Sequence, residues 1–381
     1  MKVSCLQENL SAGLADVGRA VASRTPLPIT NNVLIATDNG RLKLSATNLE
    51  LSITSWIGAK VEEEGVIAVP ARLLTEFVSS LPSEQVEMSL PARSRSLNVK
   101  CARFEANISG ADPEEFPPTP TISDGLEVEI ASDVLQMAIQ NVAFAAATED
   151  SRPVLTGVQL ELKGDTLLLA AADGFRLAVH EAKLGSAVPE DTTVIVPAKT
   201  LSEVSRVASG QEEPIKIMVN AGKTQVLFRL KDAEIVSQLI QGTFPNYGQL
   251  IPKDFATRAI IDVSEFARAT RAASIFARDG SGIVRLQMTA GEGEGGVGTL
   301  SVSARSEEVG DDEGKIDATV EGEPAKIAFN SKYLSDVLNV LGQGMVALET
   351  SSPSSPGVLR PVSPAEGTTY VHVVMPMFVQ W

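Results

Sequence analysis

The chain has 381 residues, of which 44% are hydrophobic and 21% charged, so it can bury several domain-sized cores. Its two cysteines are too few for a disulfide framework, and its two histidines, His180 and His372, stand at no metal-ligand or catalytic spacing. The net charge of −16 counts against a nucleic-acid partner unless the basic residues gather on one surface, because phosphate binding relies on lysine and arginine.

No apolar run in the chain approaches the roughly 20 residues that a membrane span needs. The first residues also lack the apolar stretch of a signal peptide. We therefore expect a cytoplasmic protein whose cysteines are reduced and which holds no metal and no cofactor.

The first predicted element is a helix over residues 9–22, where apolar residues recur at helical spacing, and similar helices are predicted over residues 132–145 and 264–276. Alternating apolar sequence after each helix predicts β-hairpins. A hairpin in the middle of the chain turns at Asp173–Gly174, and we align Thr47–Asn48 with this turn in the corresponding hairpin near the N-terminus.

A strand that runs directly into a helix is predicted three times, over residues 66–77, 194–204 and 326–337. Aligning Pro70, Pro197 and Asn330 separates the copies by 127 residues (197 − 70) and 133 residues (330 − 197), close to one third of the chain. Proline-rich segments over residues 112–120 and 244–252 fit linkers between the copies. We predict three α+β domains, each with two helices on antiparallel sheets, that span residues 1–122, 123–254 and 255–381.

Each strand-to-helix junction carries a cation near the start of its helix, namely Arg72, Lys199 and Lys332. Pro70 and Pro197 fit the first helical position, and the free N–H groups and dipole of a helix start attract anions. A solvated helix face often carries single cations, but the threefold recurrence favours a surface that binds regularly spaced phosphates whatever the base sequence. We assign four further residues to this DNA-facing surface: Arg24, Arg152, Arg268 and Arg271.

Four local signatures lie in the order and spacing of a known family, at residues 172–178, 244–247, 329–333 and 373–377. On these signatures and the threefold repeat, the whole chain resembles the β subunit of bacterial DNA polymerase III, the β sliding clamp family. The resemblance implies a head-to-tail homodimer whose six domains close a ring around double-stranded DNA, with helices lining the hole. It also implies a processivity factor rather than an enzyme, without catalytic residues, which associates with the bacterial nucleoid during replication.

The resemblance further implies a hydrophobic groove between the second and third domains. Linear peptide motifs of the DNA polymerase III catalytic subunit, the clamp loader, and repair and translesion polymerases are expected to dock there. The matching residues are Leu155, Gly174, Phe175, Arg176, Leu177, Pro245, Leu250, Asn330, Tyr333, Val373, Val374, Met375, Pro376 and Met377. Arg176 and Asn330 are expected to hold polar groups of the peptide. Ala172 and Phe175 stand where clamps commonly have Thr and His, so we expect a more apolar groove.

Two acidic segments are interpreted as loops. Residues 291–296 satisfy the GxGxxG spacing of nucleotide-binding motifs, but their glutamates would repel a pyrophosphate, and residues 297–302 fit a strand rather than a helix. Residues 307–313 fit a solvated loop. Two other hypotheses stay open: a repeat scaffold that binds only proteins, and an enzyme with a site between domains, for which no acid, base or nucleophile set stands out.

Overall fold

The computed structural model describes residues 1–22, 25–91, 94–149, 151–278, 282–291 and 297–380. The chain divides into two compact units. Unit 1 comprises Met1–Leu135 and Thr200–Leu239, and unit 2 comprises Gln136–Lys199 and Ile240–Trp381. All three points at which the chain passes from one unit to the other fall inside the second repeat, so the boundaries near residues 122 and 254 stay predictions about the repeats.

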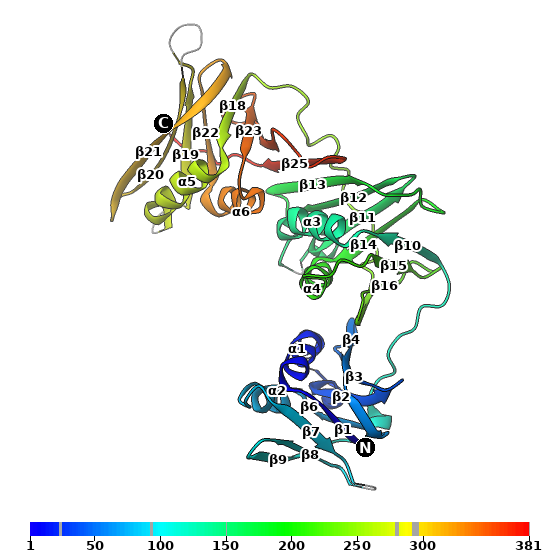
Figure 1. Ribbon diagram of the computed structural model, residues 1–381. Helices are drawn as coiled ribbons and strands as arrows, with labels where there is room; N and C mark the ends of the chain where they lie inside the picture. The colour runs from blue at the N-terminus through cyan, green and yellow to red at the C-terminus, as the bar shows by residue number, and fades with distance from the viewer. Residues whose placement is uncertain (23–24, 92–93, 150, 279–281, 292–296, 381) are drawn as a thin grey trace. The chain divides into compact units, whose positions relative to one another are not determined.

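Unit 1 contains two antiparallel sheets (Figure 1). The five-stranded sheet has the order β5-β1-β7-β8-β9, with β1 (Lys2–Leu6), β5 (Lys60–Glu63), β7 (Gln85–Ser89), β8 (Ser96–Cys101) and β9 (Phe104–Ser109). The eight-stranded sheet has the order β10-β15-β16-β17-β4-β3-β2-β6, with β2 (Asn32–Asp38), β3 (Arg41–Thr47), β4 (Leu51–Gly58), β6 (Val66–Pro70), β10 (Leu126–Ile130), β15 (Ile215–Val219), β16 (Gln225–Arg229) and β17 (Ala233–Gln238). Buried and exposed residues alternate along strands such as β7, which explains the period-two apolar pattern of the sequence.

Helices α1 (Gln7–Val17) and α2 (Ala71–Ser79) pack in unit 1, where α1 buries Leu10 and Leu14 against β3 and β4. The helix predicted over residues 9–22 ends earlier than expected. At Gly18 a 3-10 turn, η1 (Gly18–Ala20), replaces it, because glycine is a poor helix former. The prolines predicted for the first helical position are likewise one position off: Pro70 ends β6 before α2, and Pro197 ends a strand (Thr192–Pro197) before the helix Ala198–Val207.

Unit 2 contains a twelve-stranded antiparallel sheet in the order β14-β11-β12-β13-β25-β24-β23-β18-β21-β20-β19-β22. Its strands are β11 (Gly157–Lys163), β12 (Thr166–Ala172), β13 (Arg176–Lys183), β14 (Thr192–Pro197), β18 (Thr257–Asp262), β19 (Ile283–Thr289), β20 (Gly298–Ser306), β21 (Gly310–Gly322), β22 (Ala325–Asn330), β23 (Met345–Thr350), β24 (Gly357–Pro361) and β25 (Thr368–Val374). The strand predicted over residues 297–302 is confirmed as β20, and the loop predicted before it lies mostly outside the described residues. The loop predicted over residues 307–313 is wrong in part, because Asp311 already pairs with Arg305 in the β20–β21 ladder.

Helices α5 (Val263–Arg278) and α6 (Ser331–Leu341) lie side by side in unit 2, and α5 covers β20 and β21 (Figure 1). Phe266, Ala273 and Ala277 are buried along one face of α5, at the spacing that the sequence pattern predicted. Helices α3 (Ser132–Val142) and α4 (Ala198–Val207) each begin in one unit and end in the other. Among the described residues, no helix is long and apolar enough to cross a membrane.

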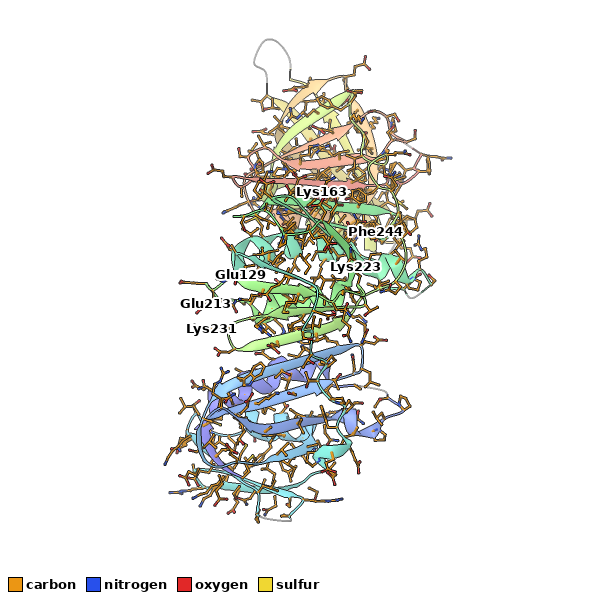
Figure 2. All side chains as sticks on the ribbon, turned by 90° about the vertical axis from the view of Figure 1, so that its right-hand side faces the viewer. Glu129, Lys163, Glu213, Lys223, Lys231 and Phe244 are labelled. Carbon is orange, nitrogen blue, oxygen red and sulfur yellow. The ribbon has the colours of Figure 1, made fainter. Side chains whose placement is uncertain are left out.

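Several lysines on the strands and turns of unit 1 are paired with neighbouring carboxylates. Lys231 Nζ lies 2.6 Å from Glu213 Oε1, and Lys216 Nζ lies 2.9 Å from Glu129 Oε1 (Figure 2 labels Glu129, Glu213 and Lys231). Both pairs are exposed to solvent and contribute little stability. They do neutralise these two cations on the surface of unit 1.

Candidate functional site

The strands β13 and β25 join the second and third repeats inside unit 2, and we call this pair seam 2. Its register places Arg176 opposite Val374, Leu177 opposite Val373 and Val179 opposite Val371. The equivalent pair in unit 1, β4 with β17, joins the first and second repeats and is called seam 1. Most of the residues predicted for the groove lie on seam 2 or on the elements next to it.

The turn that enters β13 is built by Asp173. Its Oδ1 accepts hydrogen bonds from the backbone N–H of Phe175 at 2.8 Å and of Arg176 at 3.0 Å. Gly174 has φ +94, and a Cβ there would lie 2.8 Å from Arg152 Nη1. Both the left-handed backbone and the nearby guanidinium favour glycine at this position.

The turn of seam 1 shows that the sequence alignment of the two hairpins is wrong by one residue. Asn48 Oδ1 accepts from the N–H of Glu50 at 3.0 Å and of Leu51 at 2.8 Å, as Asp173 does in seam 2. Leu49, with φ +77, therefore occupies the position of Gly174. The error arose because a leucine in the left-handed region has no sequence signature.

Arg176 is buried, with 6% of its side chain exposed, and its guanidinium is engaged inside unit 2. It donates to Asp173 Oδ2 at 3.0 Å, to Asp336 Oδ2 at 2.6 Å and to the Phe144 carbonyl at 2.7 Å. It also lies over the ring of Tyr333, 4.6 Å from the centroid. Arg176 therefore acts as an internal clasp between the second and third repeats, rather than as a free donor for a peptide.

Asn330 and Tyr333 shape the start of α6. The Asn330 side chain accepts from the backbone N–H of Lys332 at 2.9 Å and of Tyr333 at 3.4 Å, so it caps the helix. The Tyr333 ring stacks on Phe175 with centroids 6.5 Å apart. Burial, followed by the neighbouring Asp173, raises the pKa of Tyr333, so its hydroxyl stays protonated at neutral pH.

An apolar cluster underlies the seam. Its buried members include Leu177, Val179, Phe244, Val371 and Val373, with Tyr247 and Ile251 packed against it. Phe244, labelled in Figure 2, meets Tyr247 edge to face at 6.2 Å. Large apolar side chains are exposed beside this cluster, with Phe175 and Leu250 each 57% exposed and Met375 44%. An exposed apolar patch over a buried apolar base is typical of a docking surface.

The end of the chain crosses this region and is held by its backbone. Met375 N–H donates to the Phe175 carbonyl at 2.8 Å, and Met377 N–H donates to the Ala328 carbonyl at 2.7 Å. Pro376 between them is half-buried. Among the other predicted groove residues, Leu155 and Val374 are buried and Pro245 is exposed. We name Phe175, Leu250, Met375 and the residues around them the seam-2 patch.

The two histidines lie behind the patch, on β13 and β25. Burial lowers the pKa of His180 to about 4 and that of His372 to about 3. His180 Nδ1 is 3.0 Å from Asn141 Nδ2, and the His372 ring stacks on Phe144 with centroids 5.4 Å apart. Both rings are neutral at physiological pH and form part of the packing, and the described residues contain no group of side chains that could hold a metal.

The three junction cations occupy equivalent places, since Arg72, Lys199 and Lys332 are each the second residue of their helices. The side chains of Arg72 and Lys332 are 91% and 72% exposed, although each pairs with an acid one turn later. A hollow of about 510 Å³ in unit 1 is lined in part by Arg19, Arg72 and Arg206. This places Arg206 and Arg19, which the sequence analysis did not assign, beside Arg72, which it did.

The other predicted cations are placed differently. Arg268 and Arg271 are exposed on α5, and the described residues show no ion pair for either. Arg152 donates to the Asp173 carbonyl at 2.9 Å, so it braces the turn of seam 2. Arg24 lies outside the described residues.

Family models of the DNA polymerase III beta subunit match the N-terminal domain at residues 1–120, the central domain at 129–246 and the C-terminal domain at 248–378. The chain belongs to this family. The beta sliding clamp of Synechococcus elongatus is 31% identical over 382 residues, covering 99% of each chain.

Solved structures of the family superpose over the whole chain. The DNA polymerase sliding clamp of Bacillus subtilis has a TM-score of 0.89 and 30% identity, covering 100% of both chains. The sliding clamp of Pseudomonas aeruginosa, solved bound to griselimycin, has a TM-score of 0.87 and 27% identity, with the same coverage. The predicted three-domain clamp fold of helices and antiparallel sheets is confirmed.

Family membership assigns the function. The chain is a sliding clamp of DNA polymerase III, an accessory subunit that confers processivity and is not itself catalytic. The family implies that it encircles DNA as a homodimer and has the polymerase as a partner. The predictions of a sliding clamp and of a non-enzyme are therefore confirmed.

Proposed function

We propose that the seam-2 patch is the docking site through which this clamp tethers its protein partners. The docking site comprises this patch and the residues that position it: Leu155, Gly174, Phe175, Arg176, Leu177, Pro245, Leu250, Asn330, Tyr333, Val373, Val374, Met375, Pro376 and Met377. The observation that carries the proposal is the exposed set of Phe175, Leu250 and Met375 over a buried apolar base. Methionine and aromatic side chains adapt to varied apolar anchors, which suits a site shared by several partners.

The partners that we propose are the polymerase III catalytic subunit, the clamp loader, and repair and translesion polymerases, each through a short linear peptide. Griselimycin, found with the Pseudomonas aeruginosa clamp, offers a probe for the same site. The Arg176 clasp and the Asn330 cap support the patch from below, so we assign both a structural part in peptide binding rather than a direct contact.

The test measures binding of a labelled polymerase peptide and of griselimycin to the dimer. Leu250→Ser should weaken both, because an exposed apolar anchor becomes polar, while Leu73→Ser on unit 1, which is 52% exposed, serves as a matched control. Removal of residues 375–381 should abolish peptide binding and leave the dimer intact by sedimentation. Unchanged affinity in either variant would place the docking site elsewhere.

We also propose that the helix cations face the DNA. The set is Arg24, Arg72, Arg152, Lys199, Arg268, Arg271 and Lys332. Three of these residues, Arg72, Lys199 and Lys332, occupy the same position at the start of a helix in each repeat. This regular placement of positive charge supports the assignment. The contacts would be to phosphates and would not read the base sequence.

Retention on nicked circular DNA tests the topological mechanism. A loaded clamp should remain on the circle and be lost after the circle is cut, whereas a scaffold that binds only proteins would show no such difference. Combined reversal of Arg72, Lys199 and Lys332 to glutamate should shorten retention more at low salt than at high salt, because screening weakens these contacts. We place the protein in the cytoplasm and, during replication, on the nucleoid.

A further inference from the structure

Asp336, in the middle of α6, contacts two cations that are far apart in the chain. Its Oδ2 accepts from Arg176 Nη1 at 2.6 Å and from Lys332 Nζ at 2.8 Å. The Arg176 side chain is 6% exposed and that of Lys332 is 72% exposed. A single carboxylate oxygen is thus shared by a buried cation beneath the seam-2 patch and an exposed cation at the start of α6.

We propose that Asp336 is a positioning residue for the peptide site, and that Lys332 competes with Arg176 for it, so that a polyanion bound by Lys332 strengthens peptide binding. The inference rests on the proposed peptide site and on the proposed DNA-facing role of Lys332. It adds Asp336, which belongs neither to the four family signatures nor to the patch.

The contacts show how Asp336 reaches the patch. Arg176 lies 4.6 Å from the centroid of the Tyr333 ring, and Tyr333 stacks on the exposed Phe175 with centroids 6.5 Å apart. Holding Arg176 in place therefore holds Tyr333 and Phe175 in place. If the side chains of Tyr333 and Phe175 are already ordered, they lose less conformational freedom when a peptide binds, so the peptide binds more tightly.

The sign of the coupling follows from the shared oxygen. While Lys332 bonds to Asp336, the carboxylate is divided between two cations. When phosphate draws the Lys332 ammonium away, Asp336 is left to Arg176 alone and the clasp tightens. By linkage, a peptide that favours the tightened clasp raises the affinity for the polyanion by the same factor.

The variants that test this coupling are expected to fold. In Asp336→Asn, Arg176 keeps its bonds to Asp173 and to the Phe144 carbonyl, so its buried charge stays paired. In Lys332→Ala, only an exposed ion pair is lost. Asp317→Asn and Lys163→Ala, both exposed in unit 2, are matched controls for the loss of a carboxylate and of an ammonium.

The experiment measures the affinity of the full-length dimer for a fluorescein-labelled peptide that carries the clamp-binding motif of the polymerase catalytic subunit, with and without inorganic polyphosphate. Polyphosphate has no bases that could stack on the patch. Asp336→Asn should lower the affinity for the peptide about fivefold, and Lys332→Ala should raise this affinity about 1.4- to fivefold. The double variant should match Asp336→Asn, because Lys332 acts only through Asp336.

Polyphosphate should tighten peptide binding by wild type and by both control variants, and should have no effect on Asp336→Asn or Lys332→Ala. A purely structural role for Asp336 would lower the affinity without removing this response. Equal responses in all variants, or additive effects in the double variant, would overturn the coupling while leaving the peptide site in place. No peptide binding by wild type would overturn the proposed site and the inference together.

Discussion

Seam 1 and seam 2 are built on the same strand register, yet their central side chains differ in chemistry. In seam 1 the last pairs of the β3–β4 hairpin are Thr47 with Ser52 and Ser45 with Thr54. Ser45 Oγ lies 3.1 Å from Thr54 Oγ1, and Ser52 Oγ donates to Thr47 Oγ1 at 2.8 Å. These buried hydroxyls satisfy one another, so seam 1 is polar at its centre.

At the matching positions of seam 2, the β12–β13 hairpin pairs Ala172 with Leu177 and Ala170 with Val179. All four belong to or pack against a single apolar cluster, which continues into β25 and the segment around Phe244. In unit 1 the apolar residues of these segments form separate clusters, one that includes Phe116 and one that includes Ile122.

A continuous apolar base thus arises at a repeated junction through a few side-chain replacements, on strands of the same register. Hydroxyl pairs bond to each other and leave no continuous apolar base. Alanine, leucine and valine at the same positions merge the neighbouring clusters into one. Four experiments test this contrast.

The largest effect is expected from the linker phenylalanines, which are equally buried at 7% exposure. Phe244→Ala and Phe116→Ala should each lower the free energy of unfolding by about 3 kcal/mol, because both leave a cavity in an apolar cluster. Denaturant unfolding measures this loss. Only Phe244→Ala should also weaken peptide binding, and a similar loss of binding in Phe116→Ala would contradict the assignment of docking to seam 2.

Acid should destabilise seam 2 selectively, because the chain's two histidines both flank it. Burial lowers the pKa of His180 to about 4 and of His372 to about 3, whereas an unfolded histidine titrates near a pKa of about 6.5. Their stabilising effect is thus complete above about pH 6.5 and is lost as the pH falls towards 4. Between pH 6.5 and pH 5, the protonation of each histidine in the unfolded chain should lower the free energy of unfolding by about 2 kcal/mol.

Urea unfolding at pH 7 and pH 5 measures this loss. The double variant His180→Gln/His372→Gln should show a weaker dependence on pH, even if its stability at pH 7 is lower. The same dependence in wild type and in the double variant would mean that carboxylates alone cause the acid response.

Smaller effects on the free energy of unfolding are expected at the two turns, and they should have opposite signs. Gly174→Ala should destabilise the protein by about 1 kcal/mol, because alanine is unfavourable at φ +94 and its Cβ would press on Arg152. Leu49→Gly should be neutral or stabilising by up to about 1 kcal/mol, since it removes a leucine from φ +77. Thermal unfolding compares the two, and destabilisation by Leu49→Gly would show that the leucine side chain has a packing role.

The smallest net effect is expected from the hydroxyl pair of seam 1. Thr54→Val alone should lower the free energy of unfolding by about 1 kcal/mol, because the buried Ser45 hydroxyl loses its hydrogen-bond partner. Adding Ser45→Ala should return the stability close to that of wild type, since both partners are then apolar. If the double variant loses as much as the sum of the single variants, the hydroxyl pair is not the coupled unit that the geometry indicates.

Much of the fold followed from periodicity. The threefold strand-to-helix pattern located β6 with α2, β14 with α4, and β22 with α6 to within a few residues, because each combines alternating apolar residues with a change to helical spacing. The errors lie where local chemistry is ambiguous. Gly18 ended α1 early, and an acidic stretch that resembles a loop continued the β21 ladder from Gly310.

The site was less predictable. The resemblance pointed to Arg176 and Tyr333, but their contact with each other and the part played by Phe144 could not be read from the sequence. Lys332 and Asp336 stand at the spacing of a helical ion pair, which was a usable signal. Nothing local indicates that Arg176, far away in the chain, shares the same carboxylate.

The amino-acid sequence by itself determined the repeat, the strands and helices within it, a cation near the start of three helices, and membership of the clamp family. These properties depend on residues close together in the chain, where spacing maps directly onto one face of an element. Only the tertiary structure decided which junction has an apolar base, where Arg176 finds its partners, and why both histidines stay neutral. Each of these depends on residues brought together from separate repeats, and burial among such residues, rather than local sequence, sets the charge and the packing.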